Sequence, residues 1–136
     1  MSPTTGRILV VDDDPGMLDT LTDVLCATGY ETSAAASGHA ALAHARAGRF
    51  DLVLMDVQMP GLNGVQTLHA LLALDPAIAV IMMTAYSRDD LAVESERATG
   101  FGVLSKPLDL DRVLPLVKRI VSSRAGGREG EGPAPA

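Results

Sequence analysis

The stretch LVVDDDPGM, residues 9–17, sets an apolar run directly before three adjacent aspartates, a proline and a glycine. The apolar run is typical of a buried strand, and Asp14 followed by Pro15 is typical of the cap and first residue of a helix. Adjacent carboxylates repel one another and are costly to desolvate. The charge at this strand end therefore needs an explanation beyond the fold itself.

The same order of strand and helix recurs along the whole chain. Short apolar or β-branched runs predict strands at residues 7–11, 30–35, 52–55, 79–83 and 102–105. Helix-like stretches alternate with them at residues 15–28, 38–48, 64–74, 88–99 and 109–124. Three strands are continuously apolar, as expected for a parallel sheet covered on both faces. We therefore predict an α/β fold, a doubly wound five-stranded parallel sheet with five helices.

The predicted elements form one domain. The chain has 136 residues, enough to bury a core, and the elements occupy residues 7–124 after an N-terminal extension at residues 1–6. The remainder, AGGREGEGPAPA at residues 125–136, has almost no apolar bulk. Its composition predicts a disordered tail or the beginning of a linker.

Two predicted helices have unusual sequences. The helix at residues 88–99 offers few apolar side chains among many charged ones, so we expect it to be weakly packed and mobile. Pro115 lies inside the helix at residues 109–124, where proline removes one backbone hydrogen bond and clashes one turn back. We therefore expect a kink, an irregular first turn near Asp111, or a later helix start.

Composition excludes several classes of protein. Apolar residues make up 47% of the chain, yet no apolar run has 18 residues, which argues against both disorder and a membrane span. The net charge of −6 argues against binding of a nucleic-acid backbone. The N-terminus lacks a signal-peptide-like apolar stretch, so we expect a cytoplasmic protein. Cys26 alone cannot form an internal disulfide, and its apolar helical surroundings predict a buried structural thiol.

Polar residues follow the predicted strands where their carboxyl ends meet. The first strand delivers Asp12 and Asp13, the third Asp56, the fourth Thr84 and the fifth Lys106. Ligands of open parallel sheets bind beyond this edge. Three neighbouring carboxylates suit a hard cation such as Mg²⁺. A hydroxyl and an ammonium group suit phosphoryl oxygens, which leaves one aspartate as a phosphoryl acceptor.

Four segments together carry a family resemblance: ILVVDDDPGM, LVLMDVQMPGLNGVQTL, VIMMTAYS and GVLSKPLDLDRVL. In this order and spacing they resemble the receiver domain of two-component response regulators, over about residues 7–122. The resemblance implies a flavodoxin-like fold and a phosphorelay function. It implies that a sensor histidine kinase or phosphotransfer protein donates a phosphoryl group to Asp56 with the help of Mg²⁺, and that phosphorylation switches a protein-binding surface.

The resemblance also implies a role for each matching position. Asp56 matches the phospho-acceptor, Thr84 the switch hydroxyl and Lys106 the phosphate-binding lysine, while Pro107 follows at a peptide bond that is cis in the family. The resemblance also implies four metal ligands. Asp13 binds directly, Asp12 acts largely through a water, Asp56 contributes its carboxylate, and Gln58 contributes its main-chain carbonyl. For Asp14, capping of the helix is the simpler interpretation beside a role near the metal.

One position departs from the family's commonest pattern. Many receivers carry Tyr or Phe three residues before the lysine, and this chain has Val103 there. The usual aromatic readout cannot operate at a valine. We expect Tyr86 to cover the site instead and to shield the phosphate from water. Gln58 also flanks the route by which attacking water would reach the phosphate.

The expected protein is a signalling domain rather than an enzyme, although it takes part in its own phosphorylation and dephosphorylation. It acts as a stand-alone regulator or as the N-terminal receiver of a longer one. Its downstream partner is a protein target or an output domain. We define the switching face as the surface of the predicted helix at residues 88–99, the strand at 102–105 and the helix at 109–124, and a homodimer through this face stays an open alternative. No direct nucleic-acid or membrane partner is expected.

Two alternatives stay open from the residues. A pseudo-receiver would bind proteins constitutively, although the complete set of acidic, threonine and lysine residues argues against it. A haloacid-dehalogenase-like phosphatase needs an aspartate two residues after its nucleophile, and that position is Gln58 after Asp56. After Asp12 the position is Asp14, but no cap insertion follows. A dinucleotide-binding fold is excluded, because the first turn is acidic and lacks a glycine-rich loop.

Overall fold

The computed structural model describes residues 6–57, 64–84, 103–105 and 108–131. The elements of these residues are β1 (Arg7–Val11), α1 (Pro15–Thr28), β2 (Glu31–Ala35), α2 (Gly38–Ala47), β3 (Leu52–Asp56), α3 (Gly64–Leu74), β4 (Ala79–Thr84), β5 (Val103–Ser105) and α5 (Leu110–Glu131). They agree with the predicted elements to within one or two residues, except at the end of α5. The helix predicted at residues 88–99 lies outside the described residues.

The five strands form one sheet in the order β2-β1-β3-β4-β5, and every neighbouring pair is parallel. From β1 the chain first moves outward to β2 and then returns to the other side of β1 as β3. The order of strands therefore reverses between β1 and β3, which is where a doubly wound sheet opens a crevice for ligands. The predicted fold class is confirmed.

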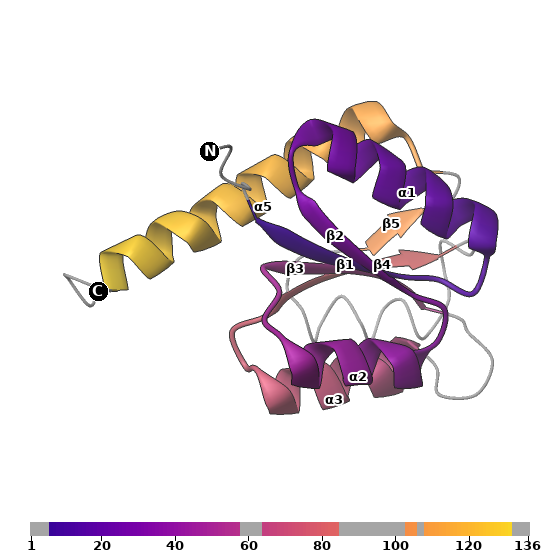
Figure 1. Ribbon diagram of the computed structural model, residues 1–136, viewed down its shortest axis with the longest axis horizontal. Coiled ribbons are helices and arrows are strands. Elements are labelled where there is room, and N and C mark those ends of the chain that lie inside the picture. The colour runs from indigo at the N-terminus through magenta and orange to yellow at the C-terminus, as the bar shows by residue number, and fades with distance from the viewer. Residues whose placement is uncertain (1–5, 58–63, 85–102, 106–107, 132–136) are drawn as a thin grey trace.

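Helices cover both faces of the sheet (Figure 1). Ile8 and Val10 of β1 point into the layer formed with α1 and α5, whereas Leu9 and Val11 point into the layer formed with α2 and α3. Every residue of β3 and β4 is buried. Because both faces are covered, these strands are continuously apolar rather than alternating, as the sequence indicated.

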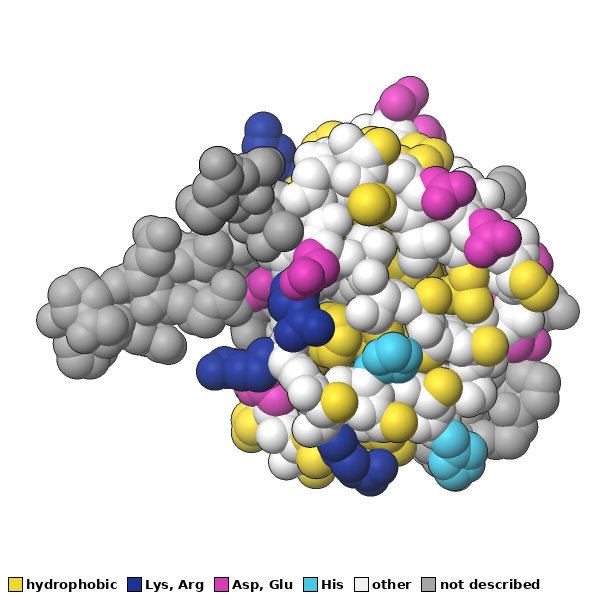
Figure 2. Space-filling view, viewed as in Figure 1, with side chains coloured by type: hydrophobic (Ala, Val, Ile, Leu, Met, Phe, Trp, Pro, Cys, Tyr) yellow, Lys and Arg dark blue, Asp and Glu magenta, His cyan; other side chains and the backbone are white. Residues whose placement is uncertain are grey.

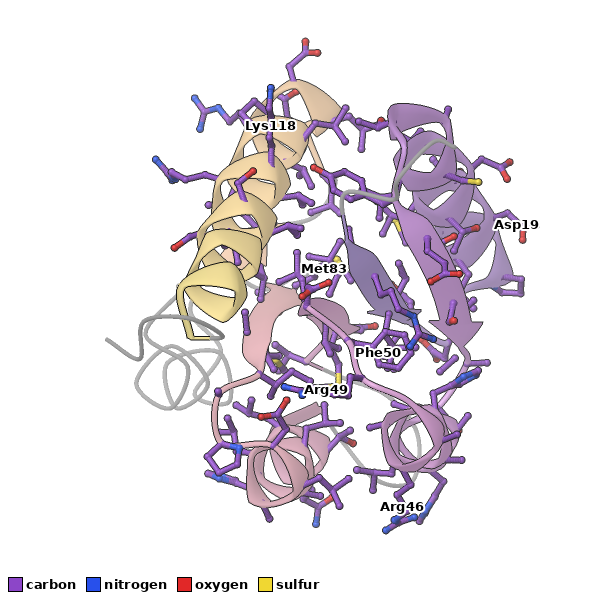
Figure 3. All side chains as sticks on the ribbon, turned by 60° about the vertical axis from the view of Figure 1, so that its left-hand side comes forward. Asp19, Arg46, Arg49, Phe50, Met83 and Lys118 are labelled. Atoms are coloured by element: carbon purple, nitrogen blue, oxygen red, sulfur yellow. The ribbon has the colours of Figure 1, made fainter. Side chains whose placement is uncertain are left out.

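Arg7 clamps the edge of the sheet at which the strands begin. Its Nη1 donates to the carbonyl oxygen of Arg49 at 2.9 Å, its Nε lies 3.0 Å from Oε1 of Glu31, and its guanidinium carbon lies 4.8 Å from the centre of the Phe50 ring. Arg49 and Phe50 belong to the segment between α2 and β3, between the two helical layers (Figure 3). One side chain thus joins β1, β2 and the segment before β3.

Cys26 is exposed, so the prediction of a buried thiol is wrong. Helix α1 buries Leu21 and Leu25 against the sheet. The next residue along a helix is turned by about 100°, which takes Cys26 out of the buried stripe. Its apolar neighbours along the sequence were therefore no guide to its burial.

Helix α5 differs from its prediction at both ends. It begins at Leu110, one residue later than expected, and Pro115 remains in its interior. It continues to Glu131, so residues 125–131 are helical rather than a disordered tail, and this part extends beyond the edge at which the strands begin (Figure 1). A helix that has already formed adds residues at little cost, even across unfavourable glycines. Gly132 and Pro133 then follow, a combination typical of a helix end.

The surface facing the viewer in Figure 2 carries acidic side chains over α1 and histidine and arginine side chains over α2. Among the described residues, no helix is both long and apolar enough to cross a membrane.

Candidate functional site

Three carboxylates converge at the carboxyl ends of β1 and β3. Asp12, Asp13 and Asp56 each offer an oxygen atom, and these oxygens lie within 4.8 Å of one another. Asp12 is fully buried and Asp56 is 7% exposed, whereas Asp13 is exposed to solvent. The cluster therefore reaches from the protein interior to the surface.

The register of the sheet explains why these residues meet. Val11 at the end of β1 pairs with Met55 on β3, so Asp12 and Asp56 are the next residues on two adjacent parallel strands. This junction is also where the strand order reverses. The carboxylates thus lie at the crevice in which an open parallel sheet binds its ligands.

Thr84 lies beside this cluster on the next strand. Asp56 pairs with Met83, and the backbone N–H of Val57 donates to the carbonyl oxygen of Met83 at 2.8 Å. Thr84 is therefore one step further along β4, and its side chain is buried, with 1% exposed. The structure brings together four of the predicted site residues: Asp12, Asp13, Asp56 and Thr84.

The connection from β1 to α1 is held by local hydrogen bonds. The backbone N–H of Asp14 donates to Oδ1 of Asp12 at 3.0 Å, and Oδ1 of Asp14 accepts from the backbone N–H of Gly16 at 3.0 Å. Asp14 is the cap of α1, with Pro15 directly after it, which confirms the capping interpretation. The bond from Asp14 to Asp12 was not predicted, although an aspartate two residues before a backbone N–H is its usual signal.

Small residues line the neighbouring strand end on the β2 side. The backbone N–H of Asp12 donates to the carbonyl oxygen of Ala35 at 3.1 Å, which extends the β1–β2 ladder to the acidic cluster. Ser37 then caps α2 by accepting from the backbone N–H of Ala40 at 3.1 Å. Only Ala36 and Ser37 lie between β2 and α2, so no large side chain follows β2 before this helix.

The chemistry of the cluster fits a divalent cation. Carboxylate oxygens are the ligands that Mg²⁺ prefers, and it usually binds one or two of them together with waters and phosphate oxygens. Three carboxylates this close would repel one another, and the N-terminus of α1 offsets only part of that repulsion. A divalent cation among them would offset two of the three negative charges.

Four predicted site residues, Gln58, Tyr86, Lys106 and Pro107, lie outside the described residues. Val103 is the first residue of β5 and pairs with Met82 on β4. The same ladder pairs Ser105 with Thr84, so Lys106 follows directly after the residue opposite Thr84. Ser105, the last described residue of β5, thus lies at the same edge of the sheet as Thr84.

Sequence comparison relates the chain to proteins of known role. Residues 8–118 match the family model of the response regulator receiver domain. The chain is 45% identical over 123 residues to the transcriptional regulatory protein ZraR of Salmonella typhimurium, covering 90% of this chain and 28% of ZraR. It is 38% identical to the sporulation initiation phosphotransferase F of Bacillus subtilis, covering 83% of this chain and 91% of that protein.

Solved structures give the same picture. A CheY-like response regulator receiver domain protein from Methanospirillum hungatei superposes with a TM-score of 0.83 and 31% identity, covering 88% of this chain and 96% of that one. The response regulator TrrA of Thermotoga maritima, in complex with Mg²⁺ and BeF, superposes with a TM-score of 0.74 and 34% identity. It covers 84% of this chain and 97% of TrrA.

Proposed function

Because the chain belongs to the response regulator receiver domain family, we propose that Asp56 accepts a phosphoryl group from a histidine kinase or phosphotransfer protein. The observation that carries this proposal is the position of Asp56, whose carboxylate completes a cluster with Asp12 and Asp13 beside the buried Thr84. A carboxylate oxygen is a known nucleophile toward phosphorus.

The metal would be held by the carboxylates of Asp12, Asp13 and Asp56 and by the main-chain carbonyl of Gln58. The complex of the related TrrA with Mg²⁺ supports a magnesium site in this chain. When bound, Mg²⁺ supplies positive charge against the phosphoryl oxygens and so permits two anions to approach each other.

The transfer itself is a displacement at phosphorus. An oxygen of Asp56 forms a bond to phosphorus while the bond from phosphorus to the donor histidine nitrogen breaks, and that nitrogen keeps the electron pair. The chain's own contribution is to hold Asp56 at the strand end and to exclude most water from it, since its side chain is almost fully buried. On this account the chain is a phosphoacceptor that assists its own modification, not an enzyme with a separate substrate.

Thr84 and Lys106 would convert the modification into a signal. The Thr84 hydroxyl donates to an oxygen of the new phosphoryl group, and the Lys106 ammonium pairs with another. Thr84 is the last residue of β4, and Lys106 follows Ser105, the last residue of β5, so we expect a movement of these two residues to shift the connection that enters α5. The binding surface around β5 and α5 then changes population between two states.

Val103 and Tyr86 would give this receiver its own readout. Valine at position 103 lacks the ring that swings inward in many receivers, so we assign that role and the shielding of the phosphate to Tyr86. Val103→Tyr is expected to leave phosphorylation intact. A Tyr86→Ala variant with an unchanged phosphate lifetime would contradict the shielding.

Two relatives differ in how much of their own length this chain covers, and this bears on the output of the chain. The chain spans 28% of ZraR, a transcriptional regulatory protein, and 91% of the phosphotransferase from Bacillus subtilis. We propose that this chain passes its signal either to an attached output domain or to a separate protein, with homodimerisation through the switching face as one route. A constitutive pseudo-receiver remains the alternative if no phosphoryl group is accepted.

The test is to incubate the chain with radiolabelled acetyl phosphate and Mg²⁺, and then to treat the labelled protein with hydroxylamine. An acyl phosphate on aspartate releases its label, whereas a phosphate ester on serine or threonine keeps it. Release of the label supports the proposal. A hydroxylamine-resistant label, or no label at all, would contradict it.

A further inference from the structure

The connection from β1 to α1 contains a series of hydrogen bonds that begins at the acidic cluster and ends inside the helix. The backbone N–H of Asp14 donates to Oδ1 of Asp12, and the side chain of Asp14 accepts from the N–H of Gly16. The carbonyl oxygen of Asp14 accepts from the N–H of Leu18 at 3.1 Å. Asp14 thus uses its N–H, its side chain and its carbonyl at once, each with a different partner.

These bonds fix the direction of the Asp14 N–H. Asp14 has an extended backbone with φ −89° and ψ 111°, and two of its three bonds tie it to the first turn of α1. Pro15 has a fixed φ and no N–H that would compete for the capping oxygen. The start of the helix therefore holds the peptide that points at Asp12.

The surroundings of the Asp12 carboxylate explain why its orientation needs a stabilising hydrogen bond. It is fully buried and lies within 4.8 Å of two other carboxylates. Mutual repulsion favours turning the three groups away from one another. A charge-assisted hydrogen bond to Oδ1 opposes that rotation and sets the plane of the carboxylate before any cation arrives.

We propose that Asp14 is a positioning residue for the metal site, acting through its hydrogen bonds and not through its charge. Its carboxylate faces the N–H of Gly16, so it contributes to cation binding only by keeping its own peptide aimed at Asp12. This inference rests on the proposed Mg²⁺-dependent function. It implies that an uncharged side chain with an acceptor oxygen at position 14 does the same work.

The test measures Mg²⁺ affinity by isothermal titration calorimetry on the full chain. Asp14→Ala removes the acceptor oxygen and is expected to weaken Mg²⁺ binding about fivefold, the size of effect typical of a lost helix cap. Asp14→Asn keeps an acceptor oxygen without the charge and is expected to stay within about twofold of the wild type. Amide hydrogen exchange at residue 14 supplies a second readout, with faster exchange expected in Asp14→Ala only.

Asp109 offers a matched control. Its Oδ1 accepts from the backbone N–H of Asp111 at 3.0 Å, the same spacing as in Asp14, and it is likewise exposed and precedes a helix. Asp109→Ala removes the same charge and the same kind of bond, together with an exposed ion pair to Arg112, and leaves the connection to Asp12 unchanged. It is expected to lower thermal stability and to leave Mg²⁺ affinity unchanged.

The outcomes separate the inference from the function on which it rests. If Asp14→Ala binds Mg²⁺ as tightly as the wild type, or Asp14→Asn as weakly as Asp14→Ala, or Asp109→Ala is equally weakened, the positioning role is overturned. A wild-type chain that binds no Mg²⁺ and accepts no phosphoryl group overturns the proposed function instead. Should Asp14→Ala not fold, Asp14→Gly replaces it, because glycine is tolerated at a cap and also lacks the acceptor oxygen.

Discussion

Thr84 lies one register step beyond Asp56 on the adjacent parallel strand, and both side chains are buried at the same edge of the sheet. A hydroxyl in this position cannot reach bulk water easily, and it belongs to the strand next to the one that bears the proposed acceptor. The strand pairing therefore brings the residue that bears this donor to the edge of the sheet at which the phosphoryl group is expected. On the proposed function, two neighbouring strands link modification to response.

Thr84→Ala is expected to separate acceptance from response. The variant keeps Asp56 and its carboxylate neighbours, so it still takes up a phosphoryl group from acetyl phosphate. It lacks the hydroxyl that would donate to a phosphoryl oxygen. The chemical-shift changes that phosphorylation causes in the amides of β5 and α5 are therefore expected to be smaller in nuclear magnetic resonance spectra. Thr84→Ser keeps the hydroxyl and restores them. Full-sized shifts in Thr84→Ala would contradict the role of the hydroxyl.

Asp56→Asn is expected to stabilise the metal-free protein by about 1 kcal/mol, because it removes one of three repelling carboxylates. Asp51 at the other end of β3 is the control, since it is also buried but accepts the backbone N–H of Arg7 at 2.9 Å. Asp51→Asn weakens that charge-assisted bond and is expected to destabilise by a similar amount, about 1 kcal/mol. Urea denaturation in EDTA measures both, and changes of the same sign would contradict the account.

Arg7→Ala is expected to destabilise the fold by about 1–2 kcal/mol, because the guanidinium contacts the Phe50 ring and the Arg49 carbonyl as well as Glu31. Glu31→Gln, by contrast, removes only an exposed ion pair and is expected to cost less than about 0.5 kcal/mol. Denaturant titration of the two variants gives the comparison. Equal losses of stability in the two variants would mean that the ion pair with Glu31, and not the contacts with the Phe50 ring and the Arg49 carbonyl, accounts for the stabilising effect of Arg7. Phosphorylation stays unchanged, since Arg7 lies at the opposite end of β1 from Asp12.

Cys26 is expected to react fully with a thiol reagent in the native protein, because the structure exposes it on α1. Reaction with dithionitrobenzoate is followed without denaturant and compared with the unfolded protein. Cys26→Ser, which keeps an exposed polar group there, is expected to change stability by no more than about 0.5 kcal/mol. A thiol that reacts only after unfolding would restore the original prediction of burial.

Much of the fold and the core of the site followed from the sequence. The continuous apolar runs ending in Asp12 and Asp56 predicted two buried strands, and a parallel sheet necessarily brings their carboxyl ends to one edge. That geometry required no knowledge of side-chain packing. Periodicity and strand-end chemistry were therefore sufficient to predict that Asp12, Asp13, Asp56 and Thr84 lie at one edge of the sheet.

The features that the sequence did not predict depend on smaller energies. Cys26 is exposed because it lies one position after the buried Leu25 on α1, and the apolar residues near it in sequence do not specify which side of the helix it occupies. The end of α5 depended on whether glycines stop a helix that has already formed, a difference of about 1 kcal/mol per residue. The bond from Asp14 to Asp12 depended on the backbone angles of the three-residue connection between β1 and α1. In each case local geometry, rather than composition, decided the outcome.

The intact mass of the chain after incubation with acetyl phosphate and Mg²⁺ tests the central claim most directly. Wild type and Asp51→Asn should each gain the mass of one phosphoryl group, whereas Asp56→Asn, and wild type in EDTA, should gain none. This pattern would assign the acceptor to the cluster end of β3 and make its modification metal-dependent. An equal gain in Asp56→Asn, or no gain in the wild type under any condition, would contradict the assignment of Asp56 as the phosphoryl acceptor.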